Sequence, residues 1–115
     1  MSSVVCRPTA RDAEDFVASF MGENTDAAAV DTLVRLQFAH AQSFPHELLA
    51  LIRDRMAMGH GGCPLIATPR QVADGIISLH QAGFGGVALS FVDYAEEFPY
   101  FRDEVLPLLI GASFR

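Results

Sequence analysis

The clearest pattern of apolar and polar positions runs from Cys63 to Tyr94. A short apolar run (residues 64–67) is followed by apolar residues at helical spacing, and then by a nearly continuous apolar run from Val87 to Val92. Apolar runs of four to eight residues are typical of buried strands, whereas a spacing of three or four residues is typical of an amphipathic helix. The stretch therefore predicts a strand, a helix and a second strand, with the second strand buried on both faces.

Capping residues define both ends of the helix in this β-α-β unit. Thr68 is suited to the N-cap, Pro69 to the first helical position, and Gln71 completes a capping box. Gly83 stands where a left-handed residue ends the helix. The predicted strands need further elements to cover their faces, because a unit of this size does not bury them alone.

The residues before this unit predict one more strand and three helices. Val4 to Cys6 is an apolar run that Pro8 ends, because proline cannot donate a hydrogen bond within a central strand. Residues 9–12 (TARD) form a capping box at the start of the first helix. Two further helices are expected between residues 26 and 58, and a terminal helix is expected after Asp93, which offers another cap.

The order of elements along the chain is β-α-α-α-β-α-β-α, with three short strands and about five helices. Alternation of this kind is typical of α/β proteins with parallel strands. With 115 residues, the chain is expected to form one domain over residues 1–115. Three parallel strands leave open sheet edges and one poorly covered face, so we expect a homo-oligomer.

Composition argues against several kinds of partner. The chain has 14 acidic and 8 basic residues, a net charge of -6, and no basic run that would suit nucleic acid. Its apolar runs are shorter than the roughly 18 residues of a membrane span, and the first residues lack a signal-peptide layout. Two cysteines provide no disulfide framework, so a cytoplasmic location is expected. The 50% hydrophobic content indicates surface that is buried against other chains, or against chain that is missing here.

Metal binding and nucleophilic catalysis have little support in the sequence. His60 and Cys63 form an H-x-x-C pair, whereas a structural zinc site needs about four ligands, so we expect no metal. The chain has no P-loop, dinucleotide-binding fingerprint or nucleophile elbow. A Cys6 nucleophile assisted by a histidine stays open as an alternative, although nothing in the spacing positions the pair.

Several motifs together resemble a known family. Four of them follow one another between residues 59 and 109: a glycine-rich loop (GHGG), a helix start (TPRQVAD), a strand (AGFGGVALSF) and a terminal helix that ends in LPLL. In this order they resemble the C-terminal end of the bacterial luciferase-like, flavin-dependent monooxygenases, which include alkanesulfonate and nitrilotriacetate monooxygenases. The opening VVCRPTARDAEDF resembles the end of strand six of that family, and residues 26–58 resemble its helical insertion.

The resemblance implies a partial (β/α)8 TIM barrel. That fold typically needs about 250 residues, so the three strands are expected to be equivalent to strands six to eight of a truncated barrel. Residues 63–94 would then be its last βαβ unit. The family's chemistry implies reduced FMN, supplied by a separate flavin reductase, which reacts with oxygen and oxygenates a small organic substrate. The isolated chain is expected to be inactive, because the family's main flavin contacts come from earlier strands.

The resemblance also implies site residues, because barrels of this kind hold their active sites at the carboxyl ends of the strands. Arg7 follows the first strand and suits a phosphate or an anionic substrate, with a carboxylate partner as the structural alternative. Ser90, Asp93 and Tyr94 follow the third strand; Asp93 is alternatively an N-cap, and Tyr94 alternatively packs at the helix start. No catalytic residue is identified. The family's mobile loop is matched by Gly59, His60, Gly61 and Gly62.

Two hypotheses of function follow from the sequence. In the first, the chain is part of an FMN-dependent monooxygenase and is incomplete alone. In the second, it is a non-catalytic, self-associating module whose oligomer buries the strands that lack neighbours, driven by the burial of apolar surface.

Overall fold

The structure is a computed structural model that describes residues 1–39, 45–58 and 62–112. The described elements are β1 (Ser2–Cys6), α1 (Ala10–Gly22), α2 (Ala27–Phe38), α3 (His46–Ala57), β2 (Cys63–Ala67), α4 (Pro69–Gln81), β3 (Leu89–Ser90), α5 (Tyr94–Glu104) and α6 (Leu106–Gly111). The α/β class and the order of elements are therefore confirmed. The terminal helix consists of two segments, α5 and α6, that meet at Val105.

β1 is the central strand of a three-stranded parallel sheet with the order β2-β1-β3. All five of its residues pair with β2, from Ser2 with Cys63 to Cys6 with Ala67. β3 adds only two pairs, both near the start of β1. Because β1 has a strand on each side, all five of its residues are buried.

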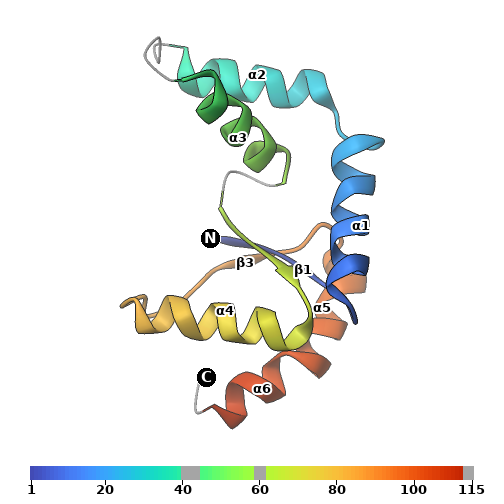
Figure 1. Cartoon of the computed structure of the whole chain (residues 1–115), viewed down its shortest axis with the longest axis vertical. Helices are drawn as coiled ribbons and strands as arrows, with labels where there is room; N and C mark the ends of the chain where they lie inside the picture. Colours follow the sequence, from blue (N-terminus) through green and yellow to red (C-terminus); the bar gives the residue numbers. More distant parts are fainter. Residues whose placement is uncertain (40–44, 59–61, 113–115) are drawn as a thin grey trace.

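The strand order differs from that of three consecutive barrel strands, which would place β2 between β1 and β3. Here the chain passes from β1 to β2 and then returns across β1 to β3. Right-handed crossovers in opposite directions place their helices on opposite faces of a sheet. Figure 1 shows this arrangement, with α4 and α6 below the sheet and α2 and α3 above it. The sheet is therefore open. α4, α5 and α6 pack on one of its faces, whereas α1 contacts β1 and β2 on the other.

The third strand is much shorter than the apolar run from Val87 to Val92 predicts. Only Leu89 and Ser90 pair with β1. Ala88 is exposed and Val92 is 50% exposed, so the prediction of a strand buried on both faces is wrong. The physical reason is position: among the described residues, no strand lies beyond β3 to pair with it or to cover it.

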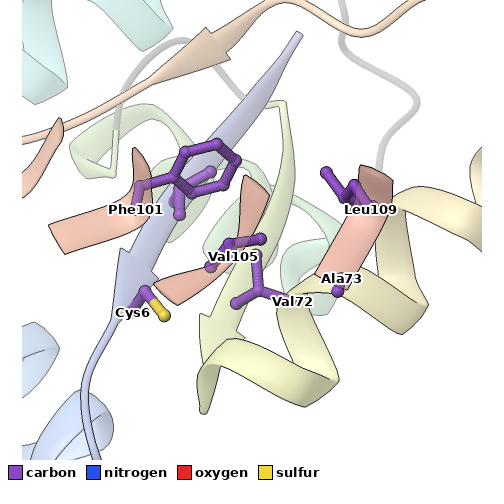
Figure 2. Packing of buried hydrophobic residues seen from close by; sticks show 7 residues of the cluster. Cys6, Val72, Ala73, Phe101, Val105 and Leu109 are labelled. Atoms are coloured by element: carbon purple, nitrogen blue, oxygen red, sulfur yellow. The ribbon is translucent and has the colours of Figure 1, made fainter. Parts of the chain in front are cut away.

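The main core lies on the face of the sheet that carries Val4 and Cys6. Its buried residues are Val4, Cys6, Val72, Ala73, Phe101, Val105 and Leu109. Phe101, Val105 and Leu109 recur every four residues, so α5 and α6 present one continuous apolar stripe. Figure 2 shows this stripe beside Cys6 of β1 and Val72 of α4.

The predicted capping box forms in full at the start of α4, whereas only its Thr9 half forms at the start of α1. The Thr9 hydroxyl accepts the backbone N–H of Asp12 at 3.1 Å, which starts α1. At the start of α4, the Thr68 hydroxyl accepts the Gln71 N–H, and the Gln71 side chain accepts the Thr68 N–H at 3.2 Å. Gly83 has a φ of 102°, a left-handed conformation that favours glycine after the end of α4.

α2 and α3 form a helical hairpin that stands away from the sheet (Figure 1). Arg53 Nε lies 2.7 Å from Asp31 Oδ1 and links the two helices. Val30 is the only buried residue of α2, and α3 has none. The Cα radius of gyration is 15.5 Å, against about 13.4 Å for a compact chain of this length. The molecule is therefore elongated.

The strand order can be tested with a disulfide. Ser3 and Ser90 are register partners whose hydroxyl oxygens are 3.4 Å apart. In a background that carries C6A and C63S, the double substitution S3C/S90C should form a disulfide under mild oxidation. Mass spectrometry of non-reduced peptides measures this directly.

The matched control is P64C/S90C in the same background. Pro64 and Ser90 both pair with Ser3, from opposite sides, so they lie about 10 Å apart, beyond the reach of a disulfide. This pair should stay reduced. Cross-linking of the control but not of the test pair would contradict the strand order, because a barrel places β2 beside β3.

Candidate functional site at the carboxyl ends of β1 and β3

The candidate site lies where the parallel strands β1 and β3 end at the same edge of the sheet. β1 leads to α1 on one face, whereas β3 leads to α5, which packs on the other face with the main core. Open α/β sheets bind ligands where the connections diverge in this way. Two small cavities lie here: one of about 230 Å³ beside Arg7, and one of about 100 Å³ beside Ser90.

Arg7 is held on three sides by its own chain. Its Nη2 lies 3.0 Å from Glu97 Oε1, and its Nη1 donates to the Cys6 carbonyl oxygen at 2.9 Å. The guanidinium also lies over the Phe16 ring, 4.1 Å from the ring centre, in a cation–π contact. The carboxylate pairing that the sequence offered as an alternative is therefore present. A role for Arg7 in cofactor binding stays a prediction.

Glu97 is the central residue of the site, and the sequence analysis missed it. Its side chain is only 6% exposed, and Oε2 accepts the backbone N–H groups of Val92 at 2.9 Å and Asp93 at 3.0 Å. Oε1 has no hydrogen-bond donor among the described residues, since the nearby Arg7 Nη2 is not aligned for one and attracts it through charge. The carboxylate thus occupies an anion site made by two amides and a guanidinium.

The signal that could have revealed Glu97 is weak. The pattern DYAE points to Glu96 as the capping partner, but Glu96 is exposed. Asp93 caps α5 by itself, because its Oδ1 accepts the N–H groups of Ala95 at 3.0 Å and Glu96 at 3.3 Å. Which acidic residue turns inward depends on the rotation of α5 against β1, and that rotation is set by tertiary packing.

Ser90 and Tyr94 have structural contacts as well. The Ser90 hydroxyl lies 3.4 Å from both the Ser2 carbonyl oxygen and the Ser3 hydroxyl, so it links β3 to β1. Tyr94 is 60% exposed and stacks on Phe98, with ring centres 5.0 Å apart and planes 8° apart. Phe91 lies edge-on to both rings. The aromatic cluster therefore offers an exposed flat face beside the strand ends.

The structure brings these predicted residues together to different degrees. Arg7 and Asp93 meet at Glu97, one through its side chain and the other through its backbone N–H. Ser90 borders the smaller cavity, and Tyr94 reaches the edge through its contact with Phe91.

The predicted mobile loop falls largely outside the described residues. Gly59, His60 and Gly61 are not among them, whereas Gly62 is. A Cβ added to Gly62 would lie 2.5 Å from the Met1 carbonyl oxygen, and the next residue, Cys63, donates its N–H to that oxygen at 3.2 Å. Glycine is therefore required here by the close approach of β2 to the start of β1.

Cys6 is a poor candidate for a nucleophile. Burial raises the pKa of its thiol to about 11, although the charge of Arg7 acts in the opposite direction. The thiolate is the reactive species, so Cys6 is protonated and unreactive at neutral pH. Among the described residues, no group of three or more His, Cys, Asp or Glu side chains could hold a metal ion.

A larger, apolar groove lies away from the strand ends, between α4, the segment 84–87 and α6. Its volume is about 570 Å³, and its walls include Ile76, Phe84, Leu106 and Ile110. The described residues that line it include no arginine, and the chain contains no lysine. The groove therefore suits an apolar group. His80 is the one ionisable residue among the described residues that line it, and no arginine or lysine faces it for the phosphate of a flavin.

Comparisons of the chain with protein-family models, with curated proteins and with solved structures found no match. The resemblance to flavin-dependent monooxygenases therefore depends on the sequence motifs alone. None of the helices in the described ranges has the length and apolar character needed to span a membrane.

The importance of Glu97 can be measured by its removal. E97A leaves two backbone N–H groups and the Arg7 guanidinium without their partner. Loss of one member of a buried ion pair costs about 3–5 kcal/mol. Because Arg7 is 24% exposed and so partly solvated, we expect E97A to lower the free energy of unfolding by about 2–3 kcal/mol, as measured by urea denaturation.

The control for this measurement is E104A, which removes an exposed glutamate from the same helix. It should change the free energy of unfolding by no more than about 0.5 kcal/mol. Equal effects of E97A and E104A would show that the Glu97 carboxylate does not hold the strand ends together.

Proposed function

We propose that the chain is the closing portion of a luciferase-like, FMN-dependent monooxygenase, active only together with further barrel strands. The motifs in the sequence support this proposal, as does the order of elements along the chain. The single structural observation that supports it is the edge where β1 and β3 end. Arg7, Ser90 and Asp93 gather there, at the end of the strands where barrels of this kind hold their active sites.

The single chain, in the described arrangement, does not accommodate FMN at this edge. Glu97 already takes the Arg7 guanidinium and the N–H groups of Val92 and Asp93, which are the groups a phosphate would need. The adjoining cavity of about 230 Å³ is also smaller than the roughly 300–1,000 Å³ of typical ligand sites. Both observations support the proposal that the isolated chain is inactive.

The proposal also requires a change in strand order. In a complete barrel β2 would lie between β1 and β3, whereas β1 is central in this structure. A chain without the earlier strands has only its own strands to pair, and β1 is the one that both others reach. Assembly with the missing strands would then free β3 from β1 and allow it to pair with β2.

The DNA immediately upstream of the Met1 codon tests this proposal. We expect an in-frame continuation that encodes earlier barrel strands. The polypeptide expressed from the longer frame should quench FMN fluorescence and gain melting temperature with FMN. With a flavin reductase that supplies reduced FMN, it should also oxygenate a small organic substrate. The 115-residue chain should show none of these effects.

Two results would contradict the proposal. One is an upstream sequence that encodes no barrel strands. The other is a longer polypeptide that folds, as judged by circular dichroism, and yet leaves both FMN fluorescence and its own melting temperature unchanged.

A second candidate function is that of a non-catalytic, self-associating module. The accessible surface is 7,536 Å², against about 6,200 Å² for a compact monomer of 12.5 kDa. Beside the β3 edge, Phe84 and Ile110 at the apolar groove are 58% and 63% exposed. Burial of such surface contributes roughly 25 cal/mol per Å², which favours association over the β3 edge.

A further inference from the structure

Four leucines on the α2–α3 hairpin are exposed. Leu33 and Leu36 of α2 are 37% and 70% exposed, and Leu48 and Leu51 of α3 are 37% and 48% exposed. We call these four residues the leucine face. Single exposed leucines are common on protein surfaces, whereas four exposed leucines on two adjacent helices are typical of an interaction surface.

The helical repeat places all four leucines on one side of the hairpin. The less exposed apolar positions of the two helices are Val30, Val34 and Phe38 on α2, and Leu49, Ile52 and Met56 on α3. At 100° per residue, the exposed leucines of each helix are displaced around the helix axis from these positions. Viewed from the N-terminus of each helix, the displacement has the same sense on α2 and on α3. Because the two helices run in opposite directions (Figure 1), rotations in the same sense bring both leucine pairs to the same flank.

The length and position of the hairpin suit contact with a second copy of the chain. The whole chain exposes about 1,300 Å² more than a compact monomer of its mass, and a standard interface buries about 800 Å² on each partner. The hairpin lies at one end of the long axis, away from the strand ends (Figure 1). Each of its helices has 12 residues, about 18 Å in length, so two hairpins can align along their whole length.

The charge on the hairpin favours a second copy of the same chain as the partner. The helices carry three acidic and three basic residues: Asp31, Glu47, Asp54, Arg35, Arg53 and Arg55. The net charge of -6 therefore lies entirely on the rest of the chain. Two hairpins bring neutral surfaces together and keep the acidic parts apart, whereas contact between those acidic parts would be repulsive.

We propose that the leucine face is a homodimer interface. Two α2–α3 hairpins, related by a two-fold axis, pack against each other as a four-helix bundle. A two-fold interface uses the same surface on both copies, and bundles of four helices bury the apolar faces of their helices against one another. This interface depends neither on flavin binding nor on the β3 edge. It leaves the strand ends and the apolar groove accessible.

The test is the mass of the particle in solution, measured by sedimentation equilibrium at micromolar concentration. The natural chain should be a dimer. L36D/L51D places two buried charges in each half of the interface, so it should be a monomer at the same concentration. Its circular dichroism spectrum should match that of the natural chain, because both leucines are exposed in the single chain.

The control is F84D/I110D, which changes two apolar residues of similar exposure at the groove. This variant should remain a dimer. Dissociation of F84D/I110D combined with persistence of the L36D/L51D dimer would overturn the inference and move the interface to the β3 edge. A monomeric natural chain would overturn both the inference and the proposed association over the β3 edge.

Charge complementation keeps the test decisive if L36D/L51D does not fold alone. L36D/L51D mixed with L36R/L51R should form heterodimers, because each interface then pairs opposite charges. Native mass spectrometry distinguishes the heterodimer from both parents. Failure of the mixture to form heterodimers would overturn the inference, whatever the state of either variant alone.

Discussion

The central position of β1 organises both faces of the sheet. Of the three strands in the described ranges, only β1 has a strand on each side, and its five residues are all buried. Val4 and Cys6 anchor the core beneath α4, α5 and α6, whereas Val5 faces the opposite side with Phe20 of α1. Loss of β1 would leave β2 and β3 without a partner. The helices on both faces would then lose the surface on which they pack.

The end of β1 determines the candidate site in the same way. Arg7 follows the strand directly, and Glu97 holds it together with the two amides that follow β3. An anion-binding arrangement is therefore present but is satisfied by the chain's own carboxylate. The Glu97 carboxylate stabilises the single chain and also occupies the position that a phosphate would take. The flavin proposal therefore requires further strands and a rearranged sheet.

Local features of this fold were predictable from the sequence, and non-local ones were not. Thr68, Gln71 and Gly83 act on the backbone within a few residues, so the bounds of α4 follow from the sequence. The strand order and the two-residue length of β3 depend on contacts across the whole chain. Glu97 was missed for the same reason, because only the packing of α5 against β1 turns it inward. Arg7 was found, since it directly follows a recognisable strand.

Native-state hydrogen exchange of the β1 amides measures how far the fold depends on this strand. Amides whose protection requires the whole fold exchange only through global unfolding. The Val4 and Val5 amides should therefore exchange last, with an opening free energy equal to that of unfolding in urea. The α2 amides of a monomeric variant should exchange much earlier, because only Val30 of that helix is buried. Exchange of Val4 and Val5 well before global unfolding would contradict the central role of β1.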